Sequence, residues 1–192
     1  MQLILASQSY YRKLLLEKLG LPFTVQPADV DEAELKHEKP LDYVKRVAIA
    51  KATAISKLNP GSVVVAADTP VLVGRRILQT PQTADEARTM LRLQSGRRVT
   101  VPTVLVVADA TGKVHHKVVV SWFKFKQLPE AEIEAYIASG NWMKASGAIK
   151  FDYVDHWVTD FYGSMSGAKG LPLYETTILL ARAGIKVQPF GA

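Results

Sequence analysis

The chain has 192 residues, of which 48% are hydrophobic, and 24 Lys and Arg stand against 18 Asp and Glu, a net charge of +6. A globular chain of this length buries roughly 70% of the surface that it exposes when unfolded. The lack of cysteine excludes disulfides, thiolate nucleophiles and thiolate metal sites. No apolar run approaches the ~18 residues of a membrane span, so we expect a cytoplasmic protein without membrane contact. The positive charge suits nucleic acid or a nucleotide equally.

The N-terminal segment predicts a strand followed by a helix that can hold an anion. Gln2–Ala6 is a short apolar strand, and either Ser7 or Ser9 is the helix N-cap. Arg12 and Lys13 fall near the first turn, where cations oppose the helix dipole, so we expect a negative ligand beside the free N–H groups. The alternative is an ordinary serine cap followed by two solvated bases. The helix itself is marked by Leu14, Leu15, Leu16 and Leu19, with Gly20 after it.

A second helix and a buried strand follow. Pro40 is an early residue of a helix that ends before Asn59, and Lys51 lies on or beside its apolar face. A lysine there can simply extend its stem over the core. Ser62–Ala67 is an unbroken apolar run typical of a strand covered on both faces, and Asp68 ends it. Ligands bind at the carboxyl ends of such strands, although Asp68 could equally be a turn residue.

The remaining pattern predicts scaffold elements and a mixed sheet. Thr83 to Glu86 is a capping box, and Gly163–Gly170 is predicted to be a mobile loop rather than a Walker motif, because its glycine spacing is wrong. No histidine pair has the spacing of a zinc site. The predicted elements are a hairpin over 72–78, a helix to about 93, an antiparallel pair over 99–107 and 114–126, and helices over 129–138 and 173–183.

Four motifs in order resemble the Maf family of nucleoside triphosphate pyrophosphatases, and weaker matches continue nearly to the C-terminus. The segment 5–16 is similar to the family's Leu-Ala-Ser-x-Ser-Pro-Arg-Arg followed by a leucine-rich helix. Each tetrapeptide alone is weak, but the ordered set over the whole chain is specific. The other three motifs are Val30-Asp31-Glu32, Ala50-Lys51-Ala52 and Ala66-Ala67-Asp68-Thr69.

The resemblance implies a fold and an assembly. The expected fold is α/β, with a long twisted mixed β-sheet, flanking helices and two lobes around a deep cleft, similar to the inosine triphosphate pyrophosphatases. Residues 1–192 would form a single Maf-like domain, and a homodimer is a family expectation. Nucleic acid is not an expected partner, because no recognition helix, zinc finger or aromatic platform is present.

The resemblance also implies an activity, hydrolysis of a nucleoside triphosphate to the monophosphate and pyrophosphate. Such chemistry needs positive charge around the phosphates, a divalent cation and a carboxylate. Ser9 and Arg12 would hold phosphate, and Lys51 would add a point charge. Glu32 and Asp68 would hold the metal, expected to be Mg²⁺, or orient water, and by resemblance Asp68 is the general base.

Three positions are associated with base selection in this family, and here they are Tyr11, Thr69 and Asp152. An aromatic residue with an acid suits a cationic 7-methylated guanine, as in the 7-methyl-GTP subgroup. Thr69 instead matches the subgroup that acts on dTTP and UTP. We expect a 7-methylated or otherwise modified purine nucleotide to be preferred over dTTP.

The chain departs from the family pattern at two places. Tyr10-Tyr11-Arg12 replaces Pro-Arg-Arg, and Thr80 stands where a lysine precedes a proline. A lost phosphate contact costs several kcal/mol of transition-state stabilisation, so either another cation substitutes or the enzyme is slow. A second hypothesis is a binding protein that kept the cleft without turnover. The cations that could substitute are Arg75, Arg76, Lys150 and Lys169.

Overall fold

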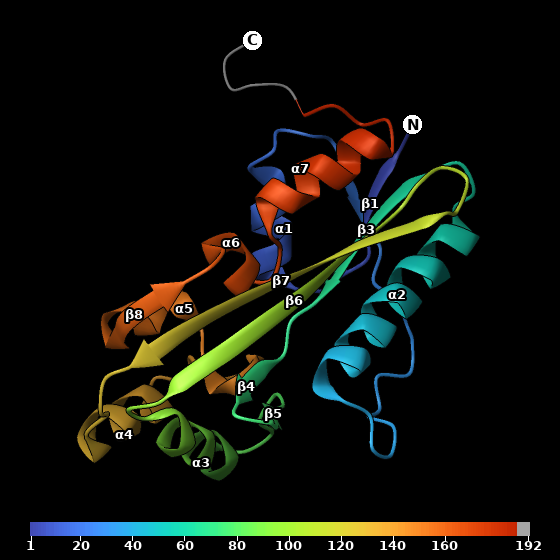
Figure 1. Cartoon of the computed structure of the whole chain (residues 1–192). Helices are drawn as coiled ribbons and strands as arrows, with labels where there is room; N and C mark the ends of the chain where they lie inside the picture. Colours follow the sequence, from blue (N-terminus) through green and yellow to red (C-terminus); the bar gives the residue numbers. More distant parts are fainter. Residues whose placement is uncertain (188–192) are drawn as a thin grey trace. The chain divides into compact units, whose positions relative to one another are not determined.

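The computed structural model describes residues 1–187 and separates the chain into two compact units (Figure 1). Unit 1 contains residues up to Thr69, Thr103–Val119 and the segment that starts at Ser164. Unit 2 contains Pro70–Pro102 and Val120–Gly163. Each unit is therefore built from segments that are far apart in the sequence. A single domain over 1–192, with a cleft between two lobes, stays a prediction.

The strands of unit 1 form a mixed sheet. β1 (Leu3–Leu5) lies between β2 (Thr24–Val25) and β3 (Val63–Asp68) and is parallel to both. β3 pairs antiparallel with β6 (Arg98–Ala108), from Val64 opposite Ala108 to Asp68 opposite Val104. β6 also pairs with β7 (Val114–Phe125). The predicted α/β class with a long mixed sheet is confirmed.

Helices cover both faces of this sheet in unit 1 (Figure 1). α2 (Pro40–Leu58) packs on β3 and buries one stripe of side chains, which matches its predicted apolar face. α1 (Tyr10–Glu17) and α7 (Leu173–Arg182) lie on the opposite side, where their leucines join a common core with alternate residues of the strands. That core includes Leu3, Leu5, Leu15, Leu16, Val63, Val65, Ala67, Leu105, Val107, Leu179 and Leu180.

Unit 2 combines the predicted hairpin with an aromatic core. β4 (Val71–Val73) pairs with β5 (Arg76–Leu78), and Leu72 is opposite Thr100 of β6. β8 (Val158–Tyr162) runs antiparallel to the end of β7. The other elements are α3 (Ala84–Gln94), α4 (Glu130–Ala138), the 3₁₀ turns η1 (Ser146–Ala148) and η2 (Asp155–Trp157), and α5 (Phe151–Val154). Ring contacts join five aromatic residues, and all of these contacts are edge-to-face except the tilted pair Phe123 and Phe125; the residues are Phe123, Phe125, Tyr136, Phe151 and Trp157.

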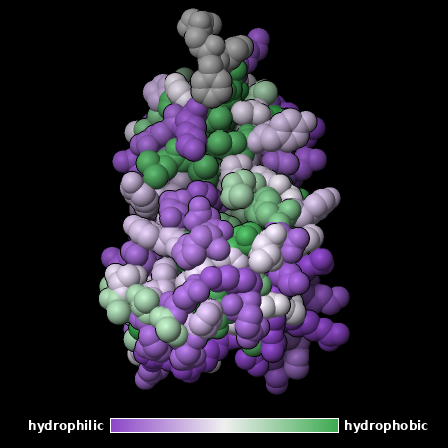
Figure 2. Space-filling view, turned by 90° about the vertical axis from the view of Figure 1, so that its left-hand side faces the viewer, coloured by the Kyte–Doolittle hydropathy of each residue, from purple (hydrophilic) through white to green (hydrophobic). Residues whose placement is uncertain are grey.

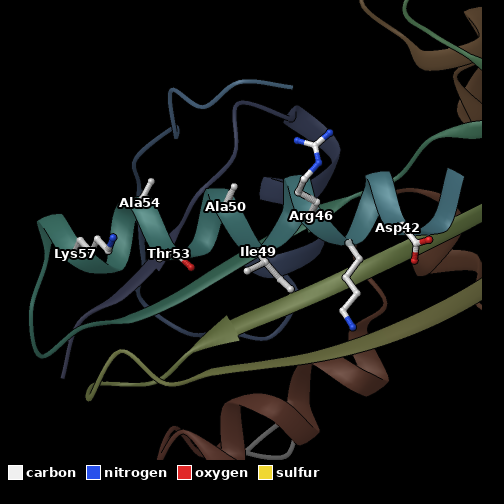
Figure 3. A pocket seen from close by; sticks show the side chains of 8 residues that line it. Asp42, Arg46, Ile49, Ala50, Thr53, Ala54 and Lys57 are labelled. Atoms are coloured by element: carbon white, nitrogen blue, oxygen red, sulfur yellow. The ribbon is translucent and has the colours of Figure 1, made fainter. Parts of the chain in front are cut away.

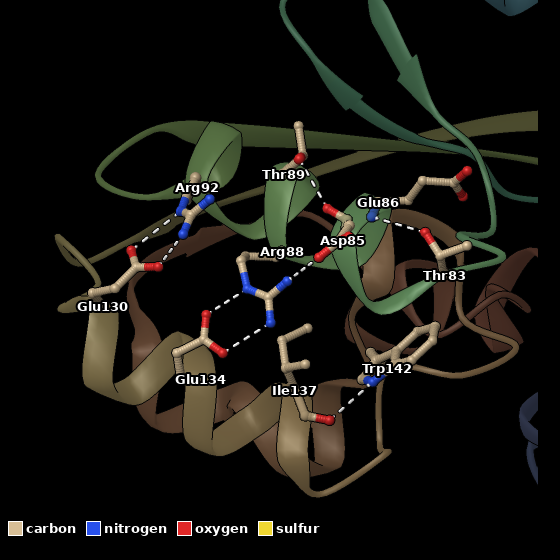
Figure 4. Close-up of polar contacts among 10 residues, drawn as sticks. All are labelled: Thr83, Asp85, Glu86, Arg88, Thr89, Arg92, Glu130, Glu134, Ile137 and Trp142. Atoms are coloured by element: carbon tan, nitrogen blue, oxygen red, sulfur yellow. Dashed lines mark hydrogen bonds and ion pairs between the residues drawn. The ribbon is translucent and has the colours of Figure 1, made fainter.

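Ion pairs join α3 to α4 (Figure 4). Arg88 donates to both carboxylate oxygens of Glu134, with Nη2 2.9 Å from Oε2, and lowers the pKa of Glu134. Arg92 is paired with Glu130 in the same way. Thr83 caps α3 by accepting from the N–H of Glu86, as predicted. The second half of the capping box differs, because the Glu86 carboxylate accepts from the N–H of Gln82 rather than Thr83.

The sequence predicted most of the long elements and missed several of the short ones. β2, β8 and α5 were not predicted, and part of the predicted loop over 163–170 is the short helix α6 (Met165–Ala168). None of the helices within residues 1–187 combines the length and hydropathy needed to cross a bilayer. On the face shown in Figure 2, hydrophobic side chains are interspersed with many hydrophilic ones.

Candidate active site

The N-terminus of α1 forms one wall of the site. Ser9 is the N-cap in extended conformation, and its Oγ accepts from the N–H of Arg12 at 3.4 Å. Ser7 is buried and accepts from the N–H of Ser9 at 3.1 Å. This answers the question that the sequence left open: Ser9 caps the helix, whereas Ser7 supports the turn that leads into it.

Arg12 is held by three contacts within unit 1. Nε donates to the carbonyl of Gly170 at 3.0 Å, Nη1 to Ser7 Oγ at 3.2 Å and Nη2 to Thr69 Oγ1 at 3.4 Å. A guanidinium has five N–H donors, so two of them, one on each terminal nitrogen, have no partner among the described residues. Burial lowers the pKa of Arg12, and the charges of Asp68 and Glu32 oppose that effect. The guanidinium is therefore oriented and can still bind an anion.

A lysine between two carboxylates forms the opposite part of the site. Lys51 Nζ lies 2.9 Å from Oε2 of Glu32 and 3.1 Å from Oδ1 of Asp68. The side chains of Lys51 and Asp68 are only 11% and 15% exposed, whereas that of Glu32 is 49% exposed. Lys51 comes from α2 and Asp68 from the end of β3. Lys51 thus ends in an ion pair rather than in solvent, and Asp68 closes a buried strand with a partner.

A cavity of about 340 Å³ brings the α1 wall together with Lys51 and Glu32. Its walls are predominantly polar, and they come from the β1–α1 turn, the segment after β2, and α2. Hydroxyls, a guanidinium and an ammonium in one hollow suit an anion with several oxygens, such as a phosphate chain. The lining residues are Ala6, Ser7, Gln8, Ser9, Arg12, Pro27, Ala28, Asp29, Val30, Glu32 and Lys51.

The three residues predicted to select the base lie in different surroundings. Thr69 directly follows Asp68, and its hydroxyl is in contact with Arg12 and with Thr103 Oγ1 at 3.0 Å. Tyr11 lies on α1, with its ring at an angle of 69° to that of Tyr10. Asp152 lies in the first turn of α5, in unit 2. The hydroxyl contact between Thr69 and Arg12 ties Thr69 to the anion site.

The carboxylates of the site suit a divalent cation that arrives with a phosphorylated ligand. Within residues 1–187, no group of three or more His, Asp or Glu side chains is arranged to hold a metal ion. Mg²⁺ is commonly bound by only one or two carboxylates, with substrate phosphates and water completing its octahedron. Glu32 and Asp68 converge on Lys51 and supply two hard oxygen donors, so the donor set fits Mg²⁺.

Thr80 and the cations that could substitute for the missing family lysine are divided between the two units. Thr80 precedes α3 in unit 2, and its carbonyl accepts from the Gln82 side chain at 3.0 Å. Of the possible substitutes, Lys169 lies in unit 1, directly before the Gly170 carbonyl that binds Arg12. Arg75, Arg76 and Lys150 lie in unit 2.

Sequence reasoning assigned no role to Thr103 and Gly170 and offered Ser7 only as an alternative N-cap, although all three contact the site. Ser7 and Thr103 are buried polar residues, and Gly170 has a φ of +111°. The signal for Ser7 was present, since a serine two residues before the N-cap lies in the strand-to-helix turn. The roles of Thr103 and Gly170 depend on partners distant in sequence, which no local pattern indicates.

A second cavity, of about 600 Å³, lies along the outer face of α2 (Figure 3). It is lined more by apolar than by polar surface and contains none of the predicted site residues. All of its lining residues belong to this one helix: Asp42, Lys45, Arg46, Ile49, Ala50, Thr53, Ala54 and Lys57.

Comparison with known proteins identifies relatives over nearly the full length. The family model for Maf-like protein matches residues 2–183. A dTTP/UTP pyrophosphatase of Chelativorans sp. (strain BNC1) is 45% identical, over 96% of this chain and 92% of the relative. A nucleoside triphosphate pyrophosphatase of Ehrlichia canis (strain Jake) is 43% identical, over 94% and 95%. The crystal structure of a nucleoside-triphosphatase / dITP/XTP pyrophosphatase from Mycobacterium abscessus has 14% identity and a TM-score of 0.45, over 67% of this chain and 76% of that one.

Proposed function

This chain belongs to the Maf family, and from that premise we propose that it is a nucleoside triphosphate pyrophosphatase that uses Mg²⁺ and acts on dTTP and UTP. Its products are the nucleoside monophosphate and pyrophosphate. The observation that carries the proposal is the polar cavity of unit 1, whose anion-binding wall at Ser9 and Arg12 is shared with Lys51 and Glu32. Asp68 joins this group through its contact with Lys51.

The phosphate chain binds at the α1 wall. The two remaining N–H groups of Arg12 and the N–H groups at the start of α1 face the negative oxygens and offset their charge. Lys51 adds a point charge on the other wall. These groups neutralise the pyrophosphate that leaves, which lowers the barrier because negative charge accumulates on its oxygens as the bond breaks.

Asp68 orients the attacking water and takes its proton. Water adds to the α-phosphorus, the bond between that phosphorus and the bridging oxygen breaks, and pyrophosphate carries away the electron pair. Lys51 holds the carboxylate in place through the 3.1 Å contact. A divalent cation held by Glu32 and Asp68 supplies, when bound, further neutralisation of the phosphate oxygens.

The proposed bases are thymine and uracil. Relatives that are 41–45% identical are named dTTP/UTP pyrophosphatases. Thr69, the residue that matched this subgroup in the sequence, lies beside Arg12 through the contact of its hydroxyl. These two observations replace the expectation of a modified purine, which depended on Tyr11 and Asp152.

A nucleotide panel tests the proposal. We expect pyrophosphate release from dTTP and UTP to exceed that from CTP, GTP and 7-methyl-GTP, and to be lost when EDTA removes the metal. Asp68→Asn should remove the activity. Equal background release from both proteins, with nucleotide still bound, would support the alternative of a binding protein without turnover. Faster cleavage of 7-methyl-GTP than of dTTP would overturn the choice of base alone.

Two further parts of the proposal concern the protein as a whole. A homodimer is carried over from the family resemblance, and a cytoplasmic location is carried over from the composition of the sequence. Light scattering on the eluting protein should give twice the 21.1 kDa mass of the chain. A mass of one chain at micromolar concentration would contradict the dimer and leave the proposed chemistry untouched.

A further inference from the structure

Thr103 is a fully buried threonine on β6 that has no role in the proposed reaction. Its Oγ1 lies 2.7 Å from the carbonyl oxygen of Gly167 and 3.0 Å from Thr69 Oγ1. Both neighbours belong to unit 1, as does Arg12, which contacts Thr69. A buried hydroxyl with two polar partners, one of which touches a substrate-binding side chain, can act on that side chain.

The chemistry of the groups fixes the direction of these hydrogen bonds. A carbonyl oxygen can only accept, so the single proton of Thr103 is donated to Gly167. Thr103 Oγ1 must then accept from Thr69, and the proton of Thr69 is committed to that bond. Arg12 has no acceptor atom and donates to Thr69. The order is therefore Arg12 to Thr69 to Thr103 to the Gly167 carbonyl.

The hydrogen-bond chain returns to the guanidinium through the loop after α6. The N–H of Gly170 donates to the carbonyl of Gly167 at 2.8 Å, and the Gly170 carbonyl accepts from Arg12 Nε at 3.0 Å. Arg12 is thus held from two sides by a closed ring of hydrogen bonds. Thr103 joins the two sides, because its hydroxyl bonds both Thr69 and the carbonyl of Gly167 in α6.

We propose that Thr103 is a positioning residue that sets the orientation of the Arg12 guanidinium, so that its two remaining N–H groups meet the phosphate chain of the substrate. The inference rests on the proposed function for the identity of that substrate. It goes beyond the proposed function by giving a role to Thr103, which is not among the residues proposed to bind the substrate, and to Gly167 of α6 and Gly170 after that helix.

Binding of inorganic tripolyphosphate, measured by calorimetry on the full chain, tests the proposal without relying on catalysis or on a base. Thr103→Val keeps the shape of the side chain and removes the hydroxyl. We expect the Kd for tripolyphosphate to rise about tenfold, the size of effect that follows from one lost, well-placed hydrogen bond to a binding residue. Thr103→Ser restores the hydroxyl and should return the Kd to within about twofold of the wild type.

Thr176 provides a matched control. It is also fully buried in unit 1, and its hydroxyl also donates to a backbone carbonyl, that of Pro172, at 2.8 Å. Thr176→Val should lower thermal stability as Thr103→Val does and leave the Kd unchanged. An equal Kd for the two valine variants would overturn the proposal, because Thr103 would then have only a structural role.

A double-mutant cycle tests whether Thr103 acts through Arg12. In an Arg12→Lys background the ring is already broken, so adding Thr103→Val should change the Kd by less than about twofold. If Thr103→Val fails to fold, Thr69→Val interrupts the same series of hydrogen bonds and should raise the Kd for tripolyphosphate by a similar factor. Additive effects in the cycle, or wild-type protein that binds no tripolyphosphate, would overturn the proposal. Tripolyphosphate binding with the expected effects of the variants, but without nucleotide hydrolysis by the wild type, would contradict the proposed function and leave the positioning role of Thr103 intact.

Discussion

Lys51 of α2 lies 3.1 Å from Asp68, the last residue of the strand that follows this helix. Because α2 packs directly on β3, the lysine reaches the carboxyl end of the strand that its own helix covers. The same ammonium also contacts Glu32, from the segment between β2 and α2. One cation thus sets the positions of two carboxylates that come from different parts of the chain.

Replacing Lys51 should lower the catalytic activity of the protein. Lys51→Met keeps the length of the side chain and removes the charge, so both carboxylates lose their shared partner. We expect kcat/KM for dTTP to fall about a hundredfold, as for other lost contacts to a transferring phosphoryl group. Lys57→Met, on the exposed last turn of the same helix, is the control in steady-state kinetics. Activity of Lys51→Met within threefold of the control would show that this contact is dispensable.

The two roles of Ser9 can be told apart by two substitutions. Ser9→Ala removes the N-cap and should lower the free energy of unfolding by about 1 kcal/mol, whereas Ser9→Gly should cost only a few tenths. Both variants lack the hydroxyl of Ser9, a residue that lines the cavity, so both should bind tripolyphosphate more weakly. Urea unfolding and calorimetry measure the two effects. If Ser9→Gly binds as tightly as the wild type, Ser9 is a cap and nothing more.

Gly147 should be far less tolerant of alanine than Gly74. Both glycines lie in unit 2 with a φ near +60°, so backbone strain is similar. A Cβ at Gly147 would come within 2.7 Å of Cγ1 of Val71, whereas one at Gly74 would meet nothing within 4 Å. We expect Gly147→Ala to cost about 1–3 kcal/mol more than Gly74→Ala in urea unfolding. Equal costs would mean that the η1 turn shifts freely away from β4.

The turn between β6 and β7 should make stability depend on acid pH. Asp109 accepts from the hydroxyl and N–H of Thr111, the N–H of Lys113 and the His115 ring, and these bonds lower its pKa to about 2. A carboxylate with a lowered folded-state pKa stabilises the fold above its unfolded pKa and loses that contribution as pH falls through the folded value. Stability should therefore drop between about pH 4 and pH 2.

Asp109→Asn tests this dependence. Its unfolding free energy should fall less steeply than that of the wild type over the same pH range, as followed by denaturant titrations at several pH values. Asp155→Asn, at a side chain that is 80% exposed, is the control and should follow the wild-type slope. Parallel slopes for all three proteins would rule out a contribution from the Asp109 turn.

The sequence predicted the elements whose signals are local. A serine cap at residue 7 or 9, Pro40 at the first turn of α2 and Asp68 at the end of β3 all follow from patterns a few residues long, and the structure selects Ser9 as the cap. β2 is only two residues long and exposed, and β8 is mostly exposed, so neither carries the alternation that predicts a strand.

The sequence predicted residues of the site, but it did not predict the contacts between them. From the sequence, the side chain of Lys51 could have extended its aliphatic stem over the core. Helical periodicity predicts the face of the helix on which a residue lies, but not the side chains that it contacts. Arg12 was predicted to bind phosphate, but its contacts with Thr69 and Gly170 bridge 57 and 158 residues of sequence. Such contacts arise from tertiary packing, which is why Thr103 received no role from the sequence.

The span of 158 residues between Arg12 and Gly170 has a consequence for synthesis on the ribosome. Ser7, Ser9 and Arg12 emerge among the first residues of the chain, and Lys51 and Asp68 follow early. The carbonyl that orients Arg12 is made only near the end, with the segment that returns to unit 1 at Ser164. A nascent chain of between about 70 and 170 residues therefore carries Arg12, Lys51 and Asp68 and lacks the bond that orients the guanidinium. Anion binding by ribosome-bound chains of increasing length should strengthen only as this last segment clears the exit tunnel.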